Sequence, residues 1–267
     1  MILVAMCAQG ATKVSVKTQH FEVKDSIRLL EKEDPNAVGY KLKKEIIADW
    51  PVSLNGKQSS ALCKLLLDSV FYAYNNRDII PYYPSDVNVL RDFVGDWVYR
   101  SLRANSIAEE YNVREPGSVP DINCEEEPMS CWYENCELKL SHVVGNLVFF
   151  MEYNDCYYGG AHNMFFTRYH AFDAALDRHI TLKDIVTSPA KLLKMLPYYD
   201  KRDPDVKWWD YITTDSIENF YVKNGKLVFV FSPYAIGPFC DGEIEIAVSL
   251  KTLKAKRLLT PYGMKIK

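Results

Sequence analysis

The sequence predicts an α+β protein, with a mixed or antiparallel sheet built largely from the C-terminal half and two longer helices from the N-terminal half. Two stretches, near 57–76 and 86–110, carry apolar residues at helical spacing. From about residue 131 onward, apolar and polar residues alternate along the chain, as in strands. The dipeptides Gly145-Asn146 and Asn224-Gly225 are hairpin signals within this region. With 267 residues, 48% of them hydrophobic, the chain can bury the core of one large or two small domains.

Residues 1–10 are typical of the end of a secretory signal peptide. They are largely apolar, and Ala8 and Gly10 place small residues where a signal peptidase needs them, so we expect cleavage before Ala11. The location would then be periplasmic or extracellular. A short buried strand is one alternative, and a lipid anchor on Cys7 is another.

Residues 11–115 form the expected N-terminal module. Alternation over 13–23 and an extended run over 38–50 predict two strands, and Pro51 with Asn55-Gly56 ends the second run. Of the two helices that follow, the second has Asp86 as a candidate N-cap and an apolar stripe suited to core packing.

Residues 116–130 are rich in Pro, Gly, Asp and Glu and predict a linker or surface loop. The C-terminal module, 131–267, should contain strands over 133–143, 147–153, 164–174, 220–222, 227–231 and 244–248, and a short helix opened by Ser188-Pro189. We expect the two modules to pack as one unit.

The net charge and the composition argue against nucleic acid as a partner and against a membrane-spanning segment. A net charge of -3 with scattered Lys and Arg gives no basic surface for nucleic acid, and no apolar run is long enough to cross a bilayer.

After removal of Cys7, six cysteines remain, an even number that favours disulfides in an exported protein. Cys136 and Cys156 are nearly opposite if the chain turns at Gly145-Asn146, so they are the leading disulfide candidates. No metal-binding spacing occurs, and we expect neither a metal nor a cofactor.

The standard catalytic and nucleotide-binding motifs do not occur in the sequence, so we assign no catalytic residue. His162 is the one histidine with a plausible chemical role, as a general base oriented by Asp155 or Asp173. The alternative is structural: Gly159 and Gly160 permit a tight turn, and the two ring nitrogens of His162 tie that turn to neighbouring groups.

The candidates for ligand contact are rigid aromatic residues and the glycine turn beside them, because large rings supply contact area at small entropic cost. They are Tyr157, Tyr158, Gly159, Gly160, His162, Trp208, Trp209 and Tyr234.

Two motifs, Tyr158-Gly159-Gly160-Ala161-His162 and Ser232-Pro233-Tyr234 through Gly242, resemble an exported bacterial family known as domain of unknown function 3298. The resemblance runs over about 131–259, and residues 11–115 resemble, more weakly, the companion domain of unknown function 4163. Relatives in that family include lysozyme-sensing anti-sigma factor ectodomains and a module of a peptidoglycan deacetylase. The resemblance implies binding or sensing in the cell envelope.

Together these observations predict an exported cell-envelope protein of non-enzymatic binding or sensing type, whose partner is a protein or a peptidoglycan-like glycan. The alternative is a cell-wall polymer hydrolase that uses His162 and nearby carboxylates.

Overall fold

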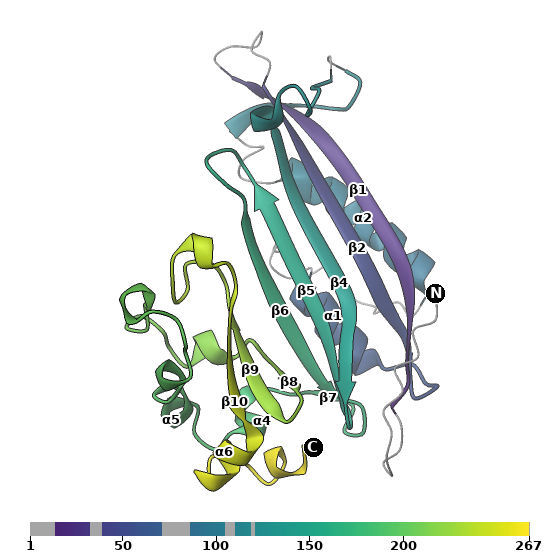
Figure 1. Ribbon diagram of the computed structural model, residues 1–267. Coiled ribbons are helices and arrows are strands. Elements are labelled where there is room, and N and C mark those ends of the chain that lie inside the picture. The colour runs from purple at the N-terminus through teal and green to yellow at the C-terminus, as the bar shows by residue number, and fades with distance from the viewer. Residues whose placement is uncertain (1–13, 33–38, 71–85, 105–109, 119–120, 267) are drawn as a thin grey trace.

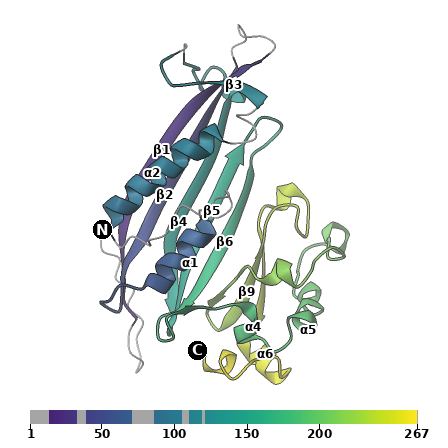
Figure 2. The same cartoon turned by 180° about the vertical axis from the view of Figure 1, so that it is seen from behind.

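The computed structural model describes residues 14–32, 39–70, 86–104, 110–118 and 121–266, and consists of two sheets with helices (Figure 1). The larger sheet has seven strands in the order β3-β1-β2-β4-β5-β6-β7, and the smaller has three in the order β10-β9-β8. Helices α1 and α2 cover one face of the larger sheet (Figure 2). The α+β class and the mixed sheet are therefore confirmed.

The N-terminal elements are β1 (Val16–Glu31), β2 (Tyr40–Leu54), α1 (Ser60–Val70), α2 (Val87–Arg103) and β3 (Tyr111–Arg114). The other strands of the larger sheet are β4 (Cys131–Val144), β5 (Leu147–Tyr157), β6 (Met164–Asp173) and β7 (Arg178–His179), of which β7 lies at the edge. The remaining strands and longer helical segments are α4 (Leu182–Ile185), α5 (Pro189–Leu193), β8 (Phe220–Lys223), β9 (Lys226–Phe231), β10 (Ile244–Ser249) and α6 (Leu250–Ala255).

The N-terminal part of the chain supplies strands of the larger sheet, as well as the helices that cover it. β1 and β2 form a long antiparallel pair, and β2 pairs in parallel with β4. β1 is longer than the predicted strand over 13–23 because it continues through charged residues that pair with β2 and then also with β3. Neighbouring strands on both sides stabilise this segment, whose polar sequence alone does not predict a strand.

Helix α2 and strand β2 show how the first core forms. Asp86 accepts a hydrogen bond from the backbone N–H of Asn88 at 2.8 Å and so caps α2, as predicted. The apolar stripe of α2 packs in one core with alternate residues of β2, including Leu42 and Trp50. A second core lies between the other face of β5 and β6 and the smaller sheet.

Both predicted hairpin turns are present. β4 pairs with β5 up to Val144 and Leu147, and β8 pairs with β9 up to Lys223 and Lys226. Asn224 and Gly225 both have positive φ, at 51° and 67°, which is the backbone that a two-residue hairpin of right-handed twist requires.

The predicted disulfide between Cys136 and Cys156 is not formed. The register of the hairpin places Cys136 opposite Asn154 and Cys156 opposite Glu134, so the two cysteines are not direct partners. Both residues carry free thiols. The disulfide instead joins Cys124 to Cys131, across the segment predicted as a linker.

Residues 1–13, which include the expected signal remnant and Cys7, lie outside the described residues. In the parts of the chain that are described, no helix is both long and apolar enough to span a membrane.

Candidate functional site

The loop between β5 and β6 begins with two glycines in left-handed backbone. Gly159 has φ 87° and Gly160 has φ 100°, values that residues with a Cβ rarely adopt. The hydroxyl of Tyr157, at the end of β5, donates to the carbonyl of Gly160 at 3.1 Å. The glycines therefore turn the chain sharply, and Tyr157 holds the turn against the strand.

His162 projects from this loop and contacts the loop between β9 and β10. Its Nδ1 atom lies 2.8 Å from the carbonyl oxygen of Asn163, and its Nε2 atom lies 3.2 Å from the hydroxyl of Tyr234. Because a carbonyl only accepts, we assign the proton to Nδ1, which leaves Nε2 to accept from Tyr234. The imidazole also stacks on Phe239, with ring centroids 3.6 Å apart.

Tyr234 occupies a strained backbone conformation on the surface. Its φ is 67°, and its side chain is 48% exposed. The left-handed region costs an L-residue about 1–2 kcal/mol, and a bulky side chain is rarely found there. A strained backbone conformation persists only where the surrounding structure holds it in place, and such conformations cluster at functional sites.

Two features hold the β9–β10 loop in this conformation. The guanidinium of Arg202 donates to the carbonyl of Ile236 at 2.8 Å and forms ion pairs with Asp200 and Asp241. A Cβ on Gly237 would lie 2.2 Å from the Arg202 guanidinium, so only glycine permits this close approach.

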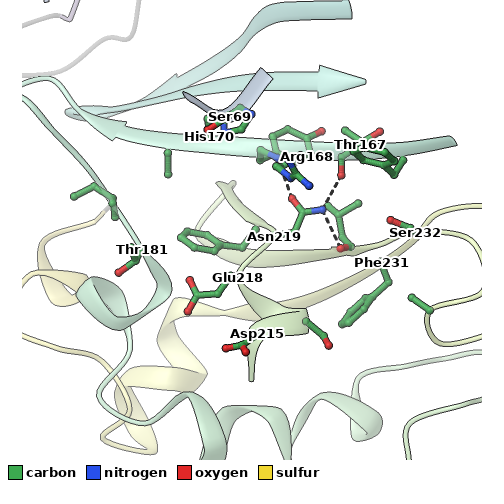
Figure 3. Close-up of a pocket in the computed structure, with 18 of the residues that line it drawn as sticks. Ser69, Thr167, Arg168, His170, Thr181, Asp215, Glu218, Asn219, Phe231 and Ser232 are labelled. Carbon is green, nitrogen blue, oxygen red and sulfur yellow. Dashed lines mark hydrogen bonds between the residues drawn. The ribbon is translucent and has the colours of Figure 1, made fainter. Parts of the chain in front are cut away.

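A cleft of about 480 Å³ adjoins the loop, between β6 and the smaller sheet (Figure 3). Ser232 and Ala235, from the same loop as Tyr234, line it. Asn219 crosses the cleft: its side-chain amide donates to the Thr167 carbonyl at 2.7 Å, and its oxygen accepts from the Tyr169 N–H at 2.9 Å. Asn219 therefore occupies hydrogen-bonding positions along the edge of β6 that a neighbouring strand would otherwise take.

The lining of the cleft combines polar and apolar side chains. Asp215 and Glu218 lie on the side of Asn219 away from His170 and Ser69 (Figure 3). One carboxylate oxygen of Glu218 accepts from the Leu182 N–H at 3.0 Å and so caps α4, while the other faces no donor among the described residues. The cleft thus offers acceptors to a polar ligand.

Two pairs of aromatic rings lie on the sheet face opposite the helices. Tyr133 lies beside Tyr157 at 6.1 Å between centroids, and Tyr153 beside Phe165 at 6.3 Å. Phe165 in turn lies 5.8 Å from Phe239, which is stacked on His162. The second pair therefore leads through Phe165 to the corner formed by His162, Tyr234 and Phe239, which we name the aromatic corner.

The structure brings together five of the eight predicted contact residues: Tyr157, Gly159, Gly160, His162 and Tyr234. Trp208 is 41% exposed, and its backbone N–H donates to Ile236 in the same loop as Tyr234. The two others face inward. The Trp209 indole donates to Asp200 at 3.0 Å, and the Tyr158 hydroxyl donates to the buried Glu134.

Sequence reasoning missed Phe239, Phe165 and the cleft residue Asn219. Phe239 stands inside the motif that runs to Gly242, where its place directly after Gly237-Pro238 was the available signal. Asn219 carried no signal, because its role depends on contacts with β6, about fifty residues earlier in the chain.

The carboxylates proposed to orient His162 are used elsewhere. Asp155 accepts from the Asn163 side-chain amide at 2.6 Å, and Asp173 accepts from Tyr262 and from the Ala175 N–H. Neither forms a hydrogen bond with His162. Within the described residues, no three His, Cys, Asp or Glu side chains are grouped so that they could hold a metal ion.

A comparison with known protein families finds a match within the C-terminal region. Residues 176–251 match the family model "Protein of unknown function (DUF3298)". The match lies within the predicted span of 131–259 and includes the Ser232–Gly242 motif, but not the Tyr158–His162 motif. No curated protein matches the chain.

Two solved structures have similar folds. A member of the DUF3298 family from Bacteroides fragilis is 19% identical, with a TM-score of 0.57 over 93% of this chain and 95% of that one. A DUF3298 family protein from Pseudomonas aeruginosa is 13% identical, with a TM-score of 0.52 over 92% of this chain and 96% of that one. At these identities the likeness extends to the fold alone. The resemblance of residues 11–115 to domain of unknown function 4163 stays a prediction.

Proposed function

This chain carries a DUF3298 region at residues 176–251, within a fold shared along nearly its whole length with two members of that family, and we propose that it is a recognition protein of the cell envelope. Its ligand is a peptidoglycan-like glycan, bound without chemical conversion at the aromatic corner and the adjoining cleft. The two modules, 11–115 and 131–267, act as one unit.

The observation that carries this proposal is the conformation of Tyr234. A half-exposed tyrosine with φ 67° costs stability, and such a cost is typically retained where the residue contributes to function. The hydroxyl of Tyr234 is already positioned by His162. A tyrosine held in advance loses little conformational entropy when a ligand docks against it.

Two further features favour a glycan over a protein. The exposed ring of Tyr234 and the half-buried rings of Tyr153 and Phe165 offer flat apolar surfaces to the apolar faces of sugar rings. The cleft beside them offers carboxylates and hydroxyls that can bond to sugar hydroxyls and amides. This arrangement of an aromatic rim beside a polar groove suits an extended polar polymer.

Export is supported by the Cys124–Cys131 disulfide, because disulfides persist in oxidising compartments. The small residues Ala8 and Gly10 of the N-terminal segment point the same way.

The proposal is tested by titrating soluble peptidoglycan strands of defined length into the purified protein by calorimetry. We expect saturable binding, weakened at least tenfold by Tyr234→Ala and unchanged by Tyr198→Ala, since Tyr198 is 81% exposed and lies outside the cleft lining. Capture of an envelope protein that depends on Tyr234, with no glycan binding, would replace the glycan by a protein ligand. Binding that is indifferent to Tyr234 contradicts the proposed site.

The hydrolase alternative has a separate test. A general base needs an orienting group and a free nitrogen, whereas both ring nitrogens of His162 are engaged and no carboxylate bonds to it. We therefore expect no release of reducing ends or of peptides from wall polymer during prolonged incubation. Release that His162→Ala abolishes, with the melting temperature unchanged, would establish the hydrolase instead.

A further inference from the structure

A buried ion pair lies on the face of the larger sheet that the helices cover. Lys44 and Glu134 are direct partners in the parallel pair of β2 and β4, and their charged groups lie 2.6 Å apart. Their relative exposures are 3% and 5%. Burying two charges costs several kcal/mol per ion, so such a pair contributes little net stability and is better explained by a positional role.

The pair also contacts the β5–β6 loop. The second carboxylate oxygen of Glu134 accepts a hydrogen bond from the hydroxyl of Tyr158, the residue directly before Gly159. On the other side, the Lys44 ammonium lies 4.5 Å from the centroid of the Trp97 ring on α2. A chain of contacts therefore runs from α2 through β2 and β4 to the first residue of the Gly-Gly turn.

Packing and a hydrogen bond together hold the Tyr158 ring. It meets the Trp132 ring edge to face, with centroids 6.3 Å apart, and Glu134 holds its hydroxyl. A cavity of about 120 Å³ lies beside this contact, lined by Lys44, Glu134, Trp97 and Tyr158 among others. Tyr157 meanwhile holds the carbonyl of Gly160. Tyr158 contacts Glu134 on the face that the helices cover, whereas Tyr157 lies beside Tyr133 on the other face, so the two tyrosines hold the loop from both sides of the sheet.

We propose that the Lys44–Glu134–Tyr158 chain positions the loop that presents His162, and through His162 the exposed Tyr234. Tyr158 is thus a positioning residue, which contacts the buried network and not the ligand. This inference rests on the proposed function for its biological meaning, because the loop matters only if the aromatic corner binds.

The experiment measures amide hydrogen exchange in the loop, which needs no ligand. Tyr158→Phe removes only the hydroxyl, and we expect exchange at residues 159–163 to rise at least tenfold while core amides of β4 and β5 exchange as in the wild type. The matched control is Tyr153→Phe, on β5 and on the face opposite the Tyr158 side chain, whose hydroxyl bonds to no described residue; it should leave loop exchange unchanged. Unchanged exchange in Tyr158→Phe overturns the proposal.

A second variant replaces the ion pair itself. Lys44→Met with Glu134→Leu substitutes apolar side chains of similar size, a change that is often neutral for stability. We expect the fold to be retained and loop exchange to rise as in Tyr158→Phe, with no further rise when the three changes are combined, since they remove one chain of contacts. Wild-type loop exchange in the folded double variant overturns the proposal.

Glycan titration then separates this inference from the proposed function. Tyr158→Phe should weaken binding at least fivefold. If the loop loosens but the wild-type protein binds no glycan, the positioning role stands and the proposed ligand is wrong.

Discussion

The hydroxyl of Tyr234 lies 3.2 Å from Nε2 of His162, although 72 positions separate the two residues in the chain. The contact joins the β5–β6 loop of the larger sheet to the β9–β10 loop of the smaller one. It places the two sequence motifs in one surface, and it keeps a strained tyrosine exposed.

Replacing Tyr234 should separate stability from binding. Asparagine tolerates left-handed backbone better than tyrosine, so Tyr234→Asn should leave the free energy of unfolding unchanged or raise it by up to about 1 kcal/mol. Glycan binding should be lost. Denaturant unfolding and calorimetry measure the two quantities.

The control for that variant is Arg257→Asn, at another exposed residue of positive φ, 56°, near the C-terminus. It should show the same small stability change and normal binding. A large loss of stability in Tyr234→Asn would mean that the ring is structural.

The junction between the sheets depends on Glu243. Its carboxylate accepts from the backbone N–H and from the hydroxyl of Thr167, a buried residue of β6. Glu243→Ala leaves both donors unsatisfied and should lower the free energy of unfolding by about 1–3 kcal/mol. The exposed Glu126→Ala serves as control, and a fall of equal size there would argue against the junction.

That junction also bears on the domain organisation. If the modules pack as one unit, the wild type should unfold in a single transition when followed by tryptophan fluorescence and by circular dichroism. Two transitions in the wild type would show that 11–115 and 131–267 are independent.

Sequence patterns predicted helices α1, α2 and α5, both hairpins, and His162 and Tyr234 of the aromatic corner, because those features depend on local periodicity and turn chemistry. Gly159, Gly160 and His162 stand together in the sequence, so their association needed no long-range information. Phe239 and Asn219 act only through contacts with β6, which no local pattern reports. The Cys136–Cys156 expectation failed for a related reason: no local pattern reports the exact register of β4 against β5, which places Cys136 opposite Asn154.

Thiol labelling should follow exposure and pKa. Cys240 is exposed and should react first with iodoacetamide. Cys63 is buried, which raises the pKa of its thiol to about 11, and burial also raises the pKa of Cys136, so both should react only after unfolding. Mass spectrometry of labelled peptides gives the order. Labelling of Cys124 or Cys131 without reductant would contradict the disulfide.

The stability of the protein should decrease in mild acid through His142. Its Nε2 atom donates to the Val222 carbonyl at 2.8 Å, and its ring stacks on Phe149, between β4 and the smaller sheet. Burial lowers the pKa of His142 below its ordinary value of 6.5, and Lys223 lowers it further, despite the opposing hydrogen bond to Val222. Below about pH 6.5 the unfolded chain therefore binds a proton that the folded chain resists, and the free energy of unfolding falls as the pH drops towards the folded pKa.

The slope from this one group cannot exceed about 1.4 kcal/mol per pH unit, and it should vanish above about pH 7. His142→Gln keeps a donor for Val222 but does not titrate, so denaturant unfolding between pH 5 and 8 should give a flatter profile for the variant than for the wild type. Other groups titrate equally in both proteins and cancel in the difference. Parallel profiles would show that His142 is as easily protonated in the folded protein as in the unfolded chain.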